Sequence, residues 1–395
     1  MPPADALPVH CPASAAAAGG LVREAVAAGH GVYPAGRGTE PDPGVPRPKP
    51  GVVLDTTALV GVVDYPARDM TVTVRAGTPV ADLTAVLAAE NQRLPVDLGD
   101  GTLGGAVASN RSGPRRLGFG TLRDYLIGVR FLTPAGDEVS GGGRVVKNVA
   151  GYDLMKLHTG AFGTLGVLTE LTFKVVPRPD DTAVVLFGLN PAALGPTLDR
   201  LHQSASRPVA VEVFSRAAAE DRRLPVAEPW VLAVGFEGKA ETVAWQVETL
   251  LAELQSAPAR GTVSHRGADA GPAWDAITRR PAGEGVLFGG TARPSRLADV
   301  LLSPAVAADR VSAGGLVGTF TVESSATAAT AAGEQLAALR TAAGDGHVGV
   351  RRRPAGWENW RPPAGRRGDH ALMLAVKTAL DPTDVFNPGR LLPLA

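Results

Sequence analysis

The chain has 395 residues, more than the roughly 250–300 at which a single hydrophobic core stops growing, so we expect at least two domains. Hydrophobic residues make up 45% and charged residues 20%, values that are typical of a globular protein and argue against a disordered one. Lys plus Arg and Asp plus Glu balance at 39 each, so no overall charge favours nucleic acid or an anionic membrane.

The sequence contains one cysteine, Cys11. A single cysteine excludes an intrachain disulfide framework, a cysteine-based zinc site and a cysteine-ligated iron–sulfur cluster within this chain. It fits a reducing, cytoplasmic setting. No apolar run approaches the roughly 18 residues of a membrane span. No Lys or Arg precedes Arg23, so we expect no signal peptide.

Short strand-like and helix-like segments alternate over the first half of the chain. An alanine-rich helix is expected at 13–28, and the alternating segment 70–74 predicts a half-buried strand. Thr78 is the expected N-cap of a helix with Pro79 at its first position. Further strands are expected in a hairpin at 129–139 and at 171–176.

The proline- and acid-rich segment 177–182 predicts a domain boundary, beyond which strands and helices alternate at longer spacing. This half predicts a sheet with helices on one face. We expect domains at 1–178 and 179–368, with a helix and tail at 369–395 that return to the first domain. Strands are predicted at 183–189, 208–214, 230–236, 285–290, 316–322 and 347–352, and helices at 191–204, 239–256, 294–302, 325–342 and 369–380.

Four clusters of glycine lie in the first domain, at 33–39, 99–105, 113–121 and 147–166. Glycines allow successive backbone amides to converge on an anion, so the first cluster is a candidate diphosphate cradle, with a tight surface turn as the alternative. The second cluster satisfies G-x-G-x-x-G, but Pro95 interrupts the segment before it and Gly113-Pro114 ends the short helix after it. A nicotinamide-binding Rossmann site is therefore not expected.

Taken together, these clusters resemble the FAD-binding domain of the vanillyl-alcohol oxidase/p-cresol methylhydroxylase (PCMH) type. Within that family they are most similar to the FAD-binding E subunits of bacterial glycolate oxidases. The resemblance implies an α+β fold: a two-subdomain PCMH-type FAD-binding domain, then an α+β cap domain with a mostly antiparallel sheet. The matching motifs lie at 34–39, 102–109, 112–116, 121–125, 146–153, 163–168 and 386–390.

The resemblance also implies the cofactor contacts. Amides of the first loop would hold the FAD diphosphate, and the later motifs would lie along the flavin or approach it through backbone groups. The first loop has no histidine, whereas relatives with covalent flavin carry one there, so non-covalent FAD is expected. The implied cofactor-binding residues are Ala35, Gly36, Arg37, Gly38, Thr39, Thr102, Gly104, Gly105, Ser109, Gly120, Thr121, Gly166 and Val167.

Oxidation of a 2-hydroxy acid needs a hydride acceptor, a base for the hydroxyl proton and a clamp for the carboxylate. Arginine suits the clamp, and Arg351, Arg352 and Arg353 are candidates, although a charge run on a strand edge is usually solvated. Arg390 is a candidate at the flavin edge. His347 has no second histidine nearby, so no metal site is expected, and the catalytic base stays unassigned.

Two functions remain open, beside a third possibility of a free-standing FAD enzyme that acts on an unrelated alcohol. The first is the FAD-binding subunit of a glycolate oxidase-type complex that oxidises glycolate, or another 2-hydroxy acid, with FAD as hydride acceptor. The second is a flavin-bearing structural or electron-transfer subunit with no turnover of its own. The resemblance implies a larger flavin-containing catalytic subunit, an iron–sulfur subunit and membrane association through these partners.

Overall fold

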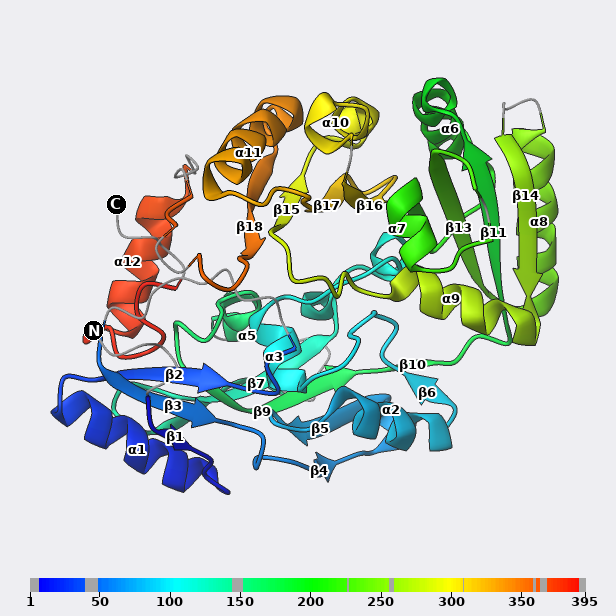
Figure 1. Ribbon diagram of the computed structural model, residues 1–395. Coiled ribbons are helices and arrows are strands. Elements are labelled where there is room, and N and C mark those ends of the chain that lie inside the picture. Colours follow the sequence, from blue (N-terminus) through cyan, green and yellow to red (C-terminus); the bar gives the residue numbers. More distant parts are fainter. Residues whose placement is uncertain are drawn as a thin grey trace.

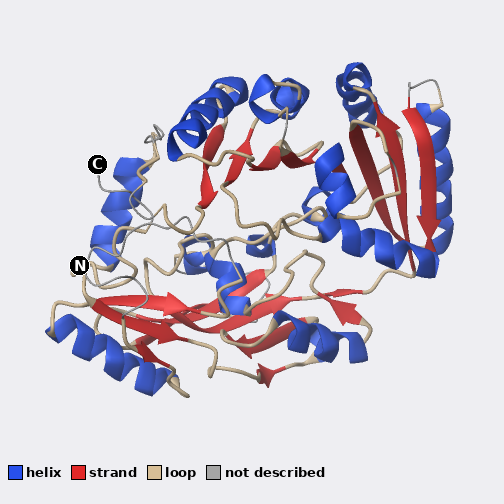
Figure 2. Ribbon diagram, viewed as in Figure 1, coloured by secondary structure: helices blue, strands red, loops and turns tan. Residues whose placement is uncertain are grey.

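The computed structural model describes residues 7–39, 49–143, 152–225, 227–255, 259–307, 309–357, 360–362 and 368–390. The chain forms two layered halves, with the large sheet of the second half standing above the sheets of the first (Figures 1 and 2). Helix α12 (His370–Leu380) lies beside the first half.

The first subdomain is a small parallel sheet in the order β1 (Val9–His10), β3 (Gly51–Asp55), β2 (Gly31–Ala35). Helix α1 (Ala15–Ala27) packs on it because Ala18, Val22 and Ala25 repeat on one face of the helix. Val167 and Phe386 close the same core, so it is completed by residues far along the sequence.

The second subdomain is a five-stranded antiparallel sheet in the order β4-β5-β9-β7-β8. Its strands are β4 (Val62–Asp64), β5 (Thr71–Arg75), β9 (Val167–Lys174), β7 (Leu126–Leu132) and β8 (Glu138–Gly142). A two-stranded ribbon, β6 (Gln92–Arg93) with β10 (Val176–Pro177), lies beside it. Its helices are α2 (Val80–Ala89), α3 (Leu103–Ala108), α4 (Arg116–Phe119) and α5 (Leu154–His158).

Two local predictions in this subdomain were wrong. Strand β5 is buried on both faces rather than one, because Thr73 hydrogen-bonds across to Thr172 at 3.0 Å between their Oγ1 atoms. Thr78 does not cap α2: its Oγ1 accepts from the Gly61 amide at 3.0 Å, and Pro79 is the N-cap. A tertiary contact replaces the expected local one in both cases.

The second half is built on one eight-stranded antiparallel sheet in the order β14-β11-β13-β12-β16-β17-β15-β18. The strands from 181 to 266 and those from 287 to 352 each follow a β-α-β-β-α-β path, so the sheet is two ferredoxin-like units joined edge to edge by β12 and β16. The strands are β11 (Asp181–Leu189), β12 (Ala210–Ser215), β13 (Trp230–Gly238), β14 (Ala259–Arg266), β15 (Leu287–Thr291), β16 (Arg310–Gly314), β17 (Thr319–Glu323) and β18 (His347–Arg352).

Helices cover both faces of this sheet, which corrects the expectation of one. Helices α6 (Pro191–Gln203), α8 (Ala240–Leu254), α10 (Leu297–Leu301) and α11 (Ala329–Ala343) pack on one face. Helices α7 (Arg216–Asp221) and α9 (Ala270–Thr278) pack on the other, over the first unit only. The antiparallel sheet confirms the expected fold class.

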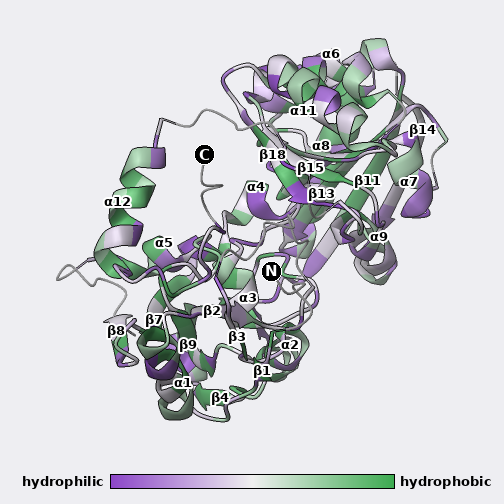
Figure 3. Ribbon diagram, turned by 60° about the vertical axis from the view of Figure 1, so that its left-hand side comes forward, coloured by the Kyte–Doolittle hydropathy of each residue, from purple (hydrophilic) through white to green (hydrophobic). Residues whose placement is uncertain are grey.

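The C-terminal segment is fastened to the first half by Lys377 on α12. Its Nζ donates to the Thr164 and Phe386 carbonyls, both at 2.9 Å, and lies 2.5 Å from Asp381 Oδ2. The Phe386 backbone also pairs with Val32 on β2. Leu372 and Leu374 on α12 are 68% and 51% exposed, and hydrophobic residues extend along this helix (Figure 3).

A buried charge network joins the two halves. Glu237 on β13 accepts from Arg93 at 2.5 Å and from Arg115 at 2.7 Å, and its side chain is 1% exposed. Arg115 also pairs with Asp97 at 2.5 Å and lies 4.0 Å from the centre of the Trp274 ring. Burial alone would raise the pKa of Glu237, but the two guanidinium groups outweigh it and lower that pKa.

We expect Glu237→Gln to lower the free energy of unfolding by about 3 kcal/mol at neutral pH. The change leaves the partly buried Arg93 without a carboxylate partner among the described residues, and it leaves Arg115 with Asp97 alone. The loss should shrink as the pH falls through the range where Glu237 is protonated, since a lowered carboxyl pKa stabilises the fold only above that range. Denaturant unfolding measures both effects. Glu220→Gln, which removes the exposed pair with Arg216, is the control and should cost less than about 1 kcal/mol.

Candidate functional site

The first glycine loop follows β2 and presents free backbone amides. The Ala35 carbonyl accepts from both the amide and the hydroxyl of Thr56 at 2.9 Å, which fixes the start of the loop. Within the described part of the chain, the amides of Gly36, Arg37, Gly38 and Thr39 have no acceptor. A short run of unpaired amides is suited to binding an anion.

The second glycine loop packs directly against the first. A Cβ on Gly36 would lie 2.5 Å from Thr102 Oγ1, and one on Gly101 would collide with Thr39 Oγ1. Thr39 Oγ1 donates to the Asp100 carbonyl at 3.1 Å. The two loops therefore approach so closely that only glycine fits at these two positions.

Helix α3 begins at the contact between the loops, and its first amides are already used. Thr102 Oγ1 accepts from the Gly105 amide at 3.2 Å, and the Gly104 amide donates to the Ala76 carbonyl at 2.7 Å. Ser109 Oγ donates to the Gly105 carbonyl at 2.8 Å. These four residues shape the wall of the site, while the free amide donors belong to loop 35–39. The helix has only six residues, unlike the long helix of a dinucleotide-binding Rossmann unit.

The other implied residues lie on separate elements. Gly166 has φ +156°, and a Cβ there would lie 2.7 Å from the Leu132 carbonyl. Val167 is completely buried in the first subdomain core, so only its backbone could approach a ligand. Gly120 and Thr121 form the turn after α4, where Thr121 donates to Asp124 and lowers the pKa of that carboxyl. No hydrogen bond in the described residues joins these four to loop 35–39.

Arg111 is the main residue that the sequence interpretation missed. Its side chain is 3% exposed and donates to the Leu98 carbonyl at 2.5 Å, to the Asp100 carbonyl and to Thr39 Oγ1 at 3.0 Å. It thus fastens the second glycine loop to the end of the first. No local sequence pattern indicates this role, because Arg111 lies outside both glycine clusters.

His158 was also missed. It is 3% exposed, its ring centre lies 4.0 Å from that of Phe131, and its Nε2 has no hydrogen-bond partner among the residues that the structure describes. Burial lowers its pKa to about 4, so it is neutral at physiological pH. A Cβ on Gly166 would lie 3.5 Å from its ring, which places an unsatisfied buried nitrogen beside one implied cofactor contact.

The arginine run on β18 is not one solvated surface. Arg352 pairs with Glu323 at 2.6 Å, and Arg353 donates to the Trp360 carbonyl at 2.5 Å. Arg351 is exposed and lies over Gly289 on the neighbouring strand.

The C-terminal motif reaches the fourth glycine cluster through Asn387, whose side-chain amide donates to the Phe162 carbonyl at 2.7 Å. The motif at 146–153 lies mostly outside the described residues.

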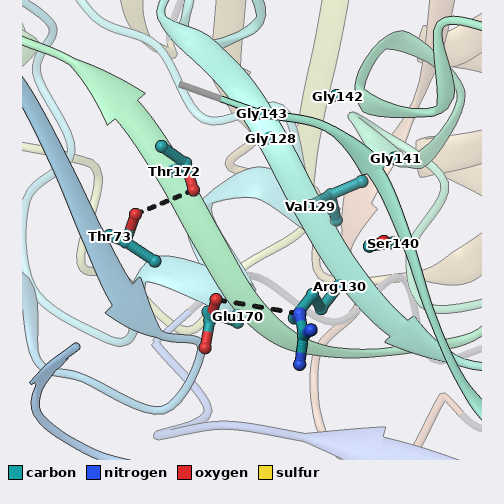
Figure 4. Close-up of a pocket in the computed structure, with 10 residues that line it drawn as sticks. All are labelled: Thr73, Gly128, Val129, Arg130, Ser140, Gly141, Gly142, Gly143, Glu170 and Thr172. Atoms are coloured by element: carbon teal, nitrogen blue, oxygen red, sulfur yellow. Dashed lines mark hydrogen bonds and ion pairs between the residues drawn. The ribbon is translucent and has the colours of Figure 1, made fainter. Parts of the chain in front are cut away.

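A polar hollow lies elsewhere, on the outer face of the five-stranded sheet (Figure 4). Thr73, Thr172, Arg130 and Glu170 line it, and the latter two form a 3.9 Å ion pair. Their strands place the core residues, including those of α3, on the opposite face. This hollow is therefore separate from the first and second glycine loops.

Within the described residues, no group of three or more His, Cys, Asp or Glu could hold a metal ion.

Comparison with known proteins adds relatives for the first half. Residues 6–142 match the family model described as FAD binding domain. Glycolate oxidase subunit GlcE of Escherichia coli (strain K12) is 44% identical over 137 residues, which cover 34% of this chain and 39% of GlcE. Subunit GlcD of Bacillus subtilis (strain 168) is 29% identical over 235 residues, 55% of this chain and 49% of GlcD. The chain thus spans less than half the length of either relative.

Among solved structures, an alkyldihydroxyacetonephosphate synthase shares the fold. The TM-score is 0.67 at 19% sequence identity, and the match covers 96% of this chain and 76% of that one. This likeness extends over the second half as well, where the curated matches do not reach fully. The two-half architecture expected from the sequence is therefore confirmed as a fold.

The residues present fit FAD. The free amides of loop 35–39 suit a diphosphate, the glycines at 36 and 101 keep the loops in contact, and the unsatisfied His158 Nε2 leaves a buried nitrogen near Gly166. Each observation concerns a different part of the junction between the two subdomains, which an extended dinucleotide can span.

We expect Arg111→Ala to weaken FAD binding by roughly 10- to 100-fold, because it removes the hydrogen bonds that hold the two glycine loops together. Arg111→Lys should lose less. Flavin fluorescence titration of the apoprotein measures the change. Arg130→Ala, in the hollow on the opposite face of the sheet, is the matched control; an equal loss there would contradict the assigned location.

Proposed function

We propose that this chain is the FAD-binding subunit of a glycolate oxidase-type complex, because residues 6–142 match the FAD binding domain model and GlcE is a relative. It oxidises a 2-hydroxy acid, glycolate to glyoxylate being the first candidate, and FAD supplies the hydride acceptor. The observation that carries the proposal is the 44% identity to GlcE over 137 residues, together with the family match over 6–142, which includes both glycine loops.

The proposal assigns the binding of FAD to the residues implied by the sequence. Loop 35–39 binds the diphosphate through its free amides, Thr102, Gly104, Gly105 and Ser109 line the flavin side, and Gly166 approaches through its backbone. We also propose that the flavin is not covalently attached, since the first loop offers Arg37 and Thr39 but no histidine.

The partners proposed are a larger flavin-containing catalytic subunit and an iron–sulfur subunit. The single cysteine, Cys11, requires that any cysteine-ligated iron–sulfur centre be held by another polypeptide. In the part of the chain that the structure describes, no helix is long and apolar enough to cross a membrane. Membrane association through the partners is part of the same proposal.

A second candidate is a flavin-bearing subunit without turnover of its own. It is favoured by the cap sheet, where His265 and His347 lie on different strands and no cluster of metal ligands occurs in the described residues. The two candidates differ in whether this chain presents substrate to its own flavin.

Acid precipitation of the purified chain tests the cofactor. We expect a flavin absorbance band near roughly 450 nm that passes into the supernatant, because no covalent bond holds it. Flavin retained in the pellet would contradict non-covalent binding. A chain that takes up no flavin after reconstitution with FAD would contradict the cofactor site.

Anaerobic addition of glycolate tests turnover. If this chain oxidises substrate, glycolate or D-lactate should bleach the flavin band of the isolated holoprotein. A flavin that stays oxidised alone and bleaches only in the assembled complex would favour the second candidate.

A further inference from the structure

Glu212 lies at the centre of the eight-stranded sheet, on β12, where the two ferredoxin-like units meet. Its neighbours Val211 and Val213 enter the core under α6 and α8, whereas Ala210 and Phe214 belong to the opposite core. Because side chains alternate along a strand, Glu212 projects from the same face as Phe214. This face carries α7 and α9 over the first unit, while α10 and α11 lie on the far face of the second (Figure 1).

The FAD-binding half touches β12 at this point. The Gly118 amide of α4 donates to the Val209 carbonyl at 3.0 Å, and a Cβ on Gly118 would lie 2.7 Å from Val209. Asp97 lies in the segment that leads into the second glycine loop and contributes to the electrostatic field at Glu212. Glu212 therefore faces the half of the molecule that carries the glycine loops.

The surroundings leave the Glu212 carboxyl without a partner. Its register neighbours on the adjacent strands are Ala233 and Gly314, and a Cβ on Gly314 would lie 3.5 Å from Glu212 Oε1. Among the described residues, no hydrogen bond or ion pair reaches this carboxyl. A half-buried carboxyl that is flanked by small residues and has no partner among the described residues is a candidate functional group.

Two charged groups act on Glu212 from different directions. Asp97 acts from the FAD-binding half, with its own partner Arg115, and Arg222 acts from the end of α7, where it stacks over Phe214. Burial first, and then Asp97, raise the pKa of Glu212 to about 8, and Arg222 opposes them. A proton acceptor that titrates near the working pH is suited to general base catalysis.

We propose that Glu212 receives the hydroxyl proton of the 2-hydroxy acid, which assigns the catalytic base that the sequence left open. This role rests on the proposed function. The C–H bond at carbon 2 breaks with its electron pair passing to FAD, which is reduced by two electrons, and the O–H proton passes to the Glu212 carboxylate. The product is the 2-oxo acid, and the proton later leaves to solvent.

The test compares wild-type and Glu212→Gln holoprotein by anaerobic stopped-flow, with glycolate and D-lactate as the probes. The wild-type rate of flavin bleaching should rise with pH and level off above about 8, because Glu212 must be ionised to accept the proton. Glu212→Gln should be at least about 100-fold slower, without that pH dependence. Binding of oxalate, an analogue with no proton to give up at carbon 2, should change by less than about threefold.

Thermal unfolding of the apoproteins gives a readout independent of turnover. A raised carboxyl pKa makes the wild type lose stability as the pH rises from about 4.5 to about 8, since the unfolded chain ionises first. The glutamine cannot ionise, so the Tm of Glu212→Gln relative to the wild type should increase across that window. A constant Tm difference would show that Glu212 titrates normally and would overturn the proposal.

Two kinetic outcomes separate the possible failures. A variant bleached as fast as the wild type, or one that keeps the same pH dependence, would overturn the role of Glu212 alone. A wild-type flavin that neither acid bleaches, alone or in the complex, would overturn the proposed function and this role with it. Glu170→Gln, on the outer face of the five-stranded sheet, is the matched control and should behave as the wild type.

Discussion

The position of the cap on the FAD-binding half depends on one buried carboxylate. Glu237 forms ion pairs with both Arg93 and Arg115. Arg115 also pairs with Asp97 and stacks on the Trp274 ring. Two guanidinium groups and two carboxylates thus pair with one another at this interface. Asp97 in turn fixes the approach to the second glycine loop, because Arg115 also donates its backbone amide to it at 2.8 Å.

Within the candidate site, too, single cationic side chains connect separate segments of the chain. Arg111 joins the two glycine loops from beneath, and Lys377 joins the C-terminal helix to the loop at Thr164. Both are long cationic side chains that bind backbone carbonyls at the points where separate segments meet. The free amides of loop 35–39 are thereby held in place before any ligand arrives, which reduces the ordering cost of binding.

Local patterns in the sequence predicted much of this structure. The helix expected at 239–256 is α8, where Val243, Leu250 and Leu254 are buried, and the hairpin expected at 129–139 is formed by β7 and β8. Strands β14 and β16 were missed because Ala259–Arg266 and Arg310–Gly314 are too polar or too short to show alternation. For the site, glycine spacing predicted the loops, whereas Arg111, His158 and Glu212 are defined by contacts with distant segments, which no local pattern records.

The paired ferredoxin-like units limit how such a cap diversifies. A duplicated unit gives two equivalent surfaces, and α7 and α9 have sealed only one of them with an apolar core. In the unit covered by α7 and α9, a substitution on this face would disturb the packing around Trp274 and Phe214 and so lower stability. The other unit has no such core on the same face, yet its glycines there are fixed too, because a Cβ on Gly314 would collide with Val317 and one on Gly289 with Arg351. Both units of the cap therefore resist larger side chains at these strand positions.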